Sequence, residues 1–323
     1  MLVISLPHYE FVRVSGEDSR SFLQGQLSCD MEQLSLEQSL QGALCNLQGR
    51  VIADFRVLQH KDSILLQTQA NQADRIIETL AKYAVFSKVV LEKVSADPDS
   101  SKISAFGIDT ASGEASTAGL LEIFPQLPDQ FPDQDNESRL SDEVALIKLP
   151  GSATRFEIWD SSESQETATR LSNLPAMTSQ HWLTLQMRAG EIHVSEDMSA
   201  EYTPQLLNYD ISGVINFKKG CYTGQEIVAR MFYRGTAKKR LYLLAQSGTS
   251  SEVIKTIHHD GKDYPVILSN KLDEGAGEEA EESLYFAVLE SDSAESGASF
   301  SSPTDPDAKL SVLPLPYGDK GGV

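Results

Sequence analysis

The segment KKGCYTGQE, residues 218–226, combines residue types from which a reactive site can be built. Gly220 and Gly224 lie on either side of Cys221, so the backbone there can turn tightly and approach a ligand closely. Thr223 and Glu226 have the spacing of a capping box, and an apolar stripe follows them. The pattern predicts that a helix begins directly after the cysteine.

Cys221 would then lie just before a helix N-terminus and close to Lys218 and Lys219, and both features favour a thiolate. A free cysteine is more often a small buried apolar residue, and this context leaves the two interpretations about equally weighted. For Cys29 and Cys45, which have apolar neighbours, burial is the expectation. The three cysteines form no CxxC pair and have no zinc-site spacing, so no metal site and no disulfide framework is expected.

The charge of the chain is unevenly distributed. The formal net charge is -20, which argues against a broad nucleic-acid-binding surface. Residues 218–240 nevertheless carry seven basic side chains and one acidic side chain, a local charge of +6. Such a basic island could receive an anionic ligand or could be a solvated loop, and charge alone does not separate the two.

The elements expected along the chain indicate an α+β protein followed by a small β-barrel. Strands are predicted over residues 11–14, 51–58, 63–68, 144–149 and 155–159, and helices over residues 18–23, 71–86 and 179–190. Asn71 is the expected cap of the second helix, and HHDGKDYP, residues 258–265, is expected to be an exposed loop. Short strands separated by acidic, Gly-rich loops such as residues 273–283 predict the barrel after residue 240.

These patterns suggest three parts: a first α+β lobe over residues 1–95, a second over 96–236 carrying KGCYTGQE, and a barrel over 237–323. The start of the chain lacks the features of a signal peptide, and no stretch approaches the ~20 apolar residues of a membrane span. A soluble cytoplasmic protein is therefore expected.

The chain resembles the YgfZ family of folate-binding proteins linked to tRNA modification. The hallmark K-G-C-Y-x-G-Q-E is complete at residues 219–226. Further matches are SGEDSRSFLQGQLSCD, KYAVFSK, QHWLTLQMRAG and the closing PLPY, in the expected order over nearly the whole chain. The resemblance implies a three-lobed fold like that of the T-protein (aminomethyltransferase) of glycine cleavage, around a central channel for tetrahydrofolate.

The resemblance also implies site residues. Two aromatic residues of the family's folate site fall on Trp182 and Tyr9, where Tyr9 replaces a more usual Trp. From the sequence itself Trp182 could equally be a core residue. The acidic tail of the folate would lie toward Arg230 and Arg234, in the basic island. Of the acidic pair that T-proteins carry, the chain retains only Asp54.

The function expected from these features is a folate-binding protein that supports tRNA modification and iron–sulfur enzymes, with Cys221 as its functional thiol. One alternative is a folate-dependent one-carbon transferase, in which Asp54 would assist proton movement. The other is an accessory module that binds tRNA directly through the basic island. The sequence leaves open whether a reaction is catalysed.

Overall fold

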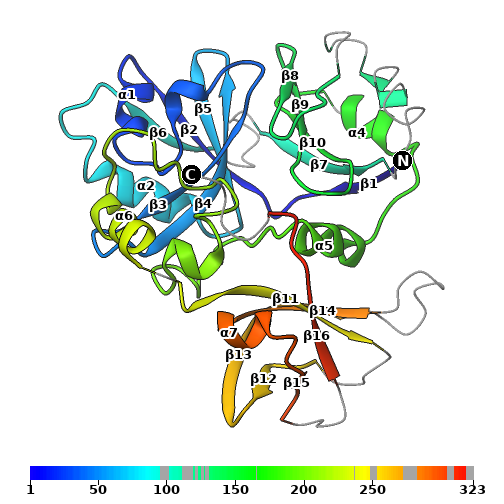
Figure 1. The fold of residues 1–323 in the computed structure, drawn as a ribbon. Helices are drawn as coiled ribbons and strands as arrows, with labels where there is room; N and C mark the ends of the chain where they lie inside the picture. The colour runs from blue at the N-terminus through cyan, green and yellow to red at the C-terminus, as the bar shows by residue number, and fades with distance from the viewer. Residues whose placement is uncertain are drawn as a thin grey trace. The chain divides into compact units, whose positions relative to one another are not determined.

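The computed structural model describes residues 1–94, 102–110, 119–120, 123–124, 127, 131–164, 166–235, 237–247, 253–271, 282–303 and 309–317. The acidic stretch expected to be a loop at residues 273–283 lies almost entirely outside them, as does part of the connection expected near residues 127–138. The chain divides into two compact units, which are described separately (Figure 1). Unit 1 comprises residues 1–178, 193–203 and 213–229, and unit 2 comprises residues 179–192, 204–212 and 230–323.

The first sheet of unit 1 has five strands in the order β3-β4-β5-β2-β6 (Figure 1). Its strands are β2 (Glu10–Ser15), β3 (Leu40–Cys45), β4 (Val51–His60), β5 (Ser63–Thr68) and β6 (Val90–Val94). The short helices α1 (Ser19–Gln24), η1 (Met31–Gln33) and α2 (Ala73–Ala81) accompany it. Alternate strand residues such as Val12, Val57 and Leu66 face a continuous apolar core with Leu23 and Ile76 of the helices.

The second sheet of unit 1 has the order β1-β7-β10-β9-β8. Its strands are β1 (Leu2–Ser5), β7 (Ser104–Asp109), β8 (Ser138–Leu140), β9 (Val144–Lys148) and β10 (Arg155–Asp160), and α4 (Glu166–Leu171) follows them in sequence. One face, with Ile108, Leu146 and Ile158, belongs to a second apolar core. Side chains of alternate register, among them Glu157 and Trp159, therefore point away from that core. Glu157 accepts a hydrogen bond from Tyr9, directly before β2, and the Trp159 ring packs edge-on against Phe11 of β2.

Unit 2 contains a closed barrel in the order β11-β14-β13-β12-β15-β16, as the spacing of short strands predicted. The strands are β11 (Lys239–Ser247), β12 (Thr256–His259), β13 (Lys262–Asn270), β14 (Glu282–Glu290), β15 (Phe300–Ser301) and β16 (Lys309–Leu313). The unit also holds α5 (Ser179–Arg188), η2 (Pro204–Leu207) and α7 (Ser291–Glu295). Helix α6 (Gln225–Arg234) begins in unit 1 and ends in unit 2.

Two local predictions are wrong. Residues 258–265 are not a loop but the two arms of the β12–β13 hairpin, and only Asp260 and Gly261 form its turn, both with positive φ. The N-cap of α2 is Gln72 and not Asn71. Asn71 has a left-handed backbone conformation, with φ 64°. Glu10 Oε2 accepts the N–H groups of Gln72 and Ala73 at 3.1 and 2.9 Å, so a strand residue supplies the cap.

Two segments that carried the resemblance meet inside unit 2. Gly190, which follows α5, has φ +74°, and a Cβ there would lie 2.3 Å from the ring of Tyr317. The Tyr317 hydroxyl donates to the Gly190 carbonyl at 3.0 Å. Glycine is therefore favoured at this position both by the backbone conformation and by the contact with the closing PLPY segment.

Among the residues that the structure describes, no helix is long and apolar enough to cross a membrane.

Candidate functional site: an anchored loop with an exposed thiol

The loop that carries Cys221 is fixed at its start by Asn216, whose Oδ1 accepts the N–H groups of Lys218 and Lys219 at 2.8 and 3.1 Å. The Lys219 side chain then runs into the protein and is 8% exposed. Its Nζ donates to the backbone carbonyls of three residues around the end of α1, Gln24 at 2.6 Å, Leu27 at 2.6 Å and Cys29 at 2.9 Å. All three donors of the ammonium group are thus used, and the motif is tied to the N-terminal segment SFLQGQLSC.

The residues after Cys221 hold the other end of the loop. Tyr222 is buried, with the Lys219 Nζ 5.3 Å from its ring centroid, and burial raises the pKa of its hydroxyl. Thr223, for which the sequence suggested a capping role, donates its hydroxyl to Gln26 Oε1 at 2.9 Å. Gly224 has φ +82°, and a Cβ there would lie 2.4 Å from the Asn46 carbonyl oxygen. Any other residue here would have a strained backbone and a clash with Asn46, and α6 begins directly afterwards.

Between these two anchors the thiol of Cys221 is exposed, as the flanking glycines predicted. Cys29 and Cys45 are buried, also as predicted, and burial raises the pKa of each thiol to about 12. The expected help of Lys219 in forming a Cys221 thiolate is not supported, because its ammonium group is bound to the three carbonyls. Lys218 is exposed. Helix α6 begins at Gln225, shortly after the cysteine, as the capping-box spacing predicted.

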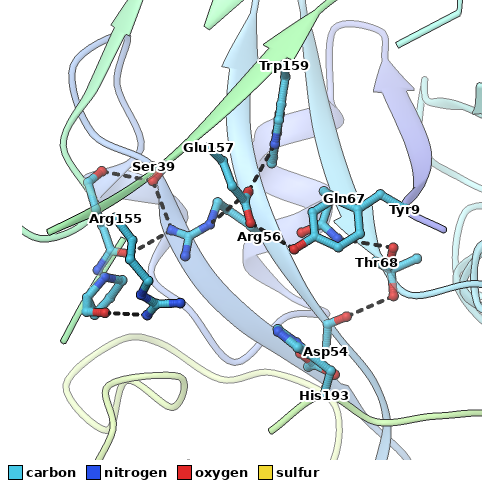
Figure 2. Close-up of polar contacts among 12 residues, drawn as sticks. Tyr9, Ser39, Asp54, Arg56, Gln67, Thr68, Arg155, Glu157, Trp159 and His193 are labelled. Carbon is cyan, nitrogen blue, oxygen red and sulfur yellow. Dashed lines mark hydrogen bonds and ion pairs between the residues drawn. The ribbon is translucent and has the colours of Figure 1, made fainter. Parts of the chain in front are cut away.

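Tyr9 and Asp54 lie in a buried polar layer between the two sheets of unit 1 (Figure 2). The Tyr9 hydroxyl donates to Glu157 Oε1 at 2.8 Å, and Trp159 Nε1 donates to Glu157 Oε2 at 3.0 Å. Arg56 Nε lies 4.0 Å from the same Oε2. A buried carboxylate of this kind needs several partners, and Glu157 has one cation and two neutral donors.

Arg56 also connects this layer to Ser39, directly before β3, and to Asn136, two residues before β8. Its guanidinium donates to Asn136 Oδ1 at 2.7 Å and to Ser39 Oγ at 3.3 Å (Figure 2). Gln67 lies opposite Arg56 in the β4–β5 register, so the two side chains share a face of the sheet. The polar layer is therefore an extended feature of unit 1 and not an isolated buried pair.

Asp54 lies two residues before Arg56 on β4 and is also buried. Its Oδ2 lies 2.6 Å from Nδ1 of His193, and its Oδ1 accepts the N–H of Val194 at 2.7 Å. This pair could not be predicted from the sequence, since the two residues stand 139 positions apart and His193 lies in no motif. Glu157 was also not predicted, because a single acidic residue within a strand pattern does not indicate a chemical role.

The remaining predicted site residues belong to unit 2. Trp182 lies on α5 and is 3% exposed. Arg230 and Arg234 are exposed and, one helical turn apart on α6, share a face of that helix. Tyr9 and Trp182 thus belong to different units, and their joint role at one ligand stays a prediction.

The basic island is less uniform than its sequence suggests. Arg240 makes a bidentate contact with the buried Asp210, at 2.8 and 2.9 Å, and Lys219 is committed to the carbonyls described above. Lys218, Arg230, Arg234, Lys238 and Lys239 remain exposed. The exposed part of the island is therefore Lys218 together with the second half of α6 and the start of β11.

Comparison with known proteins agrees with this architecture. The chain is similar to the glycine cleavage system aminomethyltransferase T from Bartonella henselae, with a TM-score of 0.76 over 98% of this chain and 86% of that one, at 15% sequence identity. This likeness confirms the aminomethyltransferase-like fold with its C-terminal barrel. The expected boundaries at residues 95 and 236 stay a prediction. No protein-family model matches the chain.

Curated relatives are similar over most of the chain. The tRNA-modifying protein YgfZ of Yersinia enterocolitica serotype O:8 is 31% identical over 256 residues, which cover 79% of this chain and 74% of that protein. The tRNA-modifying protein YgfZ of Yersinia pestis (strain Pestoides F) is 34% identical over 256 residues, covering 78% and 73%. With identity at this level over more than two thirds of both chains, and with the motif loop built as described, the chain belongs to the YgfZ family of tRNA-modifying proteins.

Proposed function

We propose that the chain binds a tetrahydrofolate and supports tRNA modification, with Cys221 as its functional thiol and iron–sulfur tRNA-modifying enzymes as the proteins it serves. The observation that carries the proposal is the construction of residues 219–224. Lys219, Tyr222 and Gly224 are each fixed by buried contacts, while the thiol between them is left exposed. The buried lysine on three carbonyls fixes the loop, and this supports a role in which the thiol is held in one place for a ligand or partner.

For the folate itself, Tyr9 and Trp182 are the proposed ring partners, because flat heterocycles stack well on aromatic faces. Arg230 and Arg234 are the proposed partners of the anionic tail, since both guanidinium groups are exposed on one face of α6. The family membership supports this assignment, and the aminomethyltransferase-like fold is consistent with it.

Folate binding is tested by tryptophan fluorescence. The chain has two tryptophans, so Trp159→Phe leaves Trp182 as the single reporter. Titration of this variant with tetrahydrofolate should quench its emission, and Trp182→Ala should weaken binding measured by calorimetry by tenfold or more, roughly the value of one lost aromatic stacking contact. Equal affinity of Trp182→Ala and the parent would show that the ring lies elsewhere.

The role of the thiol is tested in cells that lack the protein. Cys221→Ala should fold normally and yet fail to restore tRNA thiolation, whereas Cys29→Ala, which changes a buried thiol, should restore it to the extent that the variant folds. Full restoration by Cys221→Ala would refute the proposed role of this residue.

Direct tRNA binding is a second candidate, and one observation favours it. Arg230, Tyr233 and Arg234 are exposed at helical spacing on α6, which places an aromatic ring and two guanidinium groups on one side of the helix. Stacking on aromatic rings and contact of basic groups with phosphates are the usual means of binding RNA. Lys238→Gln with Lys239→Gln should reduce the salt dependence of a tRNA complex. Arg240 is unsuitable for this test because it is bound to Asp210.

A further inference from the structure

The contact between Asp54 and His193 fixes the hydrogen-bonding state of the imidazole. Asp54 Oδ2 lies 2.6 Å from Nδ1 of His193 (Figure 2). Asp54 Oδ1 accepts the N–H of Val194 at 2.7 Å. An ionised carboxylate can only accept hydrogen bonds, so Nδ1 of the ring must be the donor. The neutral ring then carries its lone pair on Nε2, the nitrogen on the far side from Asp54.

The two members of the pair differ in exposure. The side chain of Asp54 is 9% exposed and that of His193 is 28% exposed. Asp54 is held by the sheet, since its backbone carbonyl accepts the Thr68 hydroxyl at 2.9 Å as part of the β4–β5 region. The pair therefore has one buried end, Asp54, and one partly exposed end, His193.

Two charged or titratable groups near the pair are His8, in the loop before β2, and Arg56, on β4. His8 is close enough to His193 that burial and the charge of His193 lower the pKa of His8. The His8 ring is 4.9 Å from the ring of Tyr9, centroid to centroid. Arg56, the next residue on the same face of β4, has Glu157 as its counter-charge. His193 thus lies near the aromatic residue proposed to contact the folate.

A second aspartate–histidine pair, in the β12–β13 hairpin, provides a comparison, because it joins neighbouring residues at the surface. His258 Nδ1 lies 2.7 Å from Asp263 Oδ1, and their side chains are 42% and 66% exposed. The two residues are direct register partners across the β12–β13 hairpin. Such an exposed pair contributes little and orients nothing, because solvent competes for both groups.

We propose that Asp54 and His193 are a proton-transfer pair for the bound tetrahydrofolate, in which Nε2 of His193 exchanges a proton with a ring nitrogen of the ligand. In the forward direction a ring nitrogen of the ligand that carries an extra proton gives it up: its N–H bond breaks, the electron pair stays on that nitrogen, which becomes neutral, and an Nε2–H bond forms. The resulting imidazolium is stabilised by the unchanged carboxylate of Asp54. Asp54 is then a positioning residue, and His193 takes the role that the sequence suggested for Asp54. This inference rests on the proposed folate function.

The test is calorimetric titration with tetrahydrofolate in two buffers that differ in ionisation enthalpy, which gives the number of protons exchanged on binding. The parent should exchange a fraction of a proton. His193→Gln, whose amide can still donate to Asp54 but cannot titrate, should bind within about threefold of the parent and lose that exchange. His258→Gln is the matched control and should leave both quantities unchanged.

A spectroscopic measurement on the parent protein makes the test independent of how the variants fold. Long-range proton–nitrogen correlation spectra should show His193 as the tautomer protonated at Nδ1, and Asp54→Asn should allow the other tautomer. Proton exchange that is unchanged in His193→Gln, or a parent His193 protonated at Nε2 alone, would overturn the proposal. Absence of any folate binding by the parent would instead refute the proposed function on which it rests.

Discussion

Lys219 and Cys221 stand two residues apart and have opposite surroundings: the ammonium group of Lys219 is buried on three backbone carbonyls, and the thiol of Cys221 is exposed. Gly220 lies between them, but its φ is not in the left-handed region and a Cβ added to it would meet nothing within 4 Å, so the change of direction does not require glycine there. The lysine thus holds the loop in place, and the cysteine is what the loop presents.

Replacing Lys219 by Met should destabilise the protein by about 3 kcal/mol, because three buried carbonyls lose a charged donor. Lys218→Met, at the exposed neighbouring position, is the matched control and should change stability by less than about 0.5 kcal/mol. Urea unfolding of both variants measures the difference. Equal stabilities of the two would contradict the anchoring role.

Cys221 should react with iodoacetamide in the native protein much faster than Cys29 or Cys45. The reason is exposure together with the pKa of about 12 to which burial raises the two other thiols. Peptide mass spectrometry after short labelling times at neutral pH resolves the three sites. If Cys221 proves the slowest, the reactive-thiol role must be abandoned.

Gly224→Ala should be destabilised by about 1–3 kcal/mol, because a Cβ would lie 2.4 Å from the Asn46 carbonyl and φ is +82°. Gly220→Ala lacks both obstacles and should differ little from the parent. Thermal unfolding followed by circular dichroism tests the pair. A tolerated Gly224→Ala would mean that the loop can relax away from Asn46.

The stability that Cys45 contributes should depend on pH in the alkaline range. Its folded pKa is raised to about 12 from 9.0, so the thiol ionises first in the unfolded chain. The contribution is complete below about pH 8 and is lost as pH rises toward 12, at up to about 1.4 kcal/mol per pH unit. The destabilisation caused by Cys45→Ala should therefore shrink between pH 8 and 11, whereas any effect of the exposed Cys221→Ala should not follow this course.

The sequence predicted those elements whose signal is local. Helix α2 follows from the spacing of Ile76 and Leu80, and strand β4 follows from its composition, because both patterns depend only on near neighbours in the chain. The hairpin at His258 was missed because polar turn residues outweighed two short strands that only the barrel stabilises. The cap of α2 was missed because Glu10 reaches it from another strand.

In the candidate site, too, the features with a local sequence signal could be predicted and those that depend on distant residues could not. The turn at Gly224 and the exposure of Cys221 could be expected from a short motif. The burial of Lys219, the partner of Asp54 and the role of Glu157 depend on residues more than one hundred positions away. Such contacts result from tertiary packing, and no periodicity or spacing in the sequence predicts them.

Residues 193–203 and 213–229 belong to unit 1 together with residues 1–178. This affects the order in which the contacts of unit 1 can form during synthesis. Val51 donates its amide to the carbonyl of Tyr202, Ser28 donates to that of Val214, and Lys219 reaches Leu27 across 192 positions. At the usual elongation rate, about 10 to 40 seconds separate the synthesis of the N-terminal segment from that of its partners. The first sheet therefore emerges from the ribosome with these groups still solvated, and the motif that presents Cys221 is also the late-arriving segment that completes the first-made part of the protein.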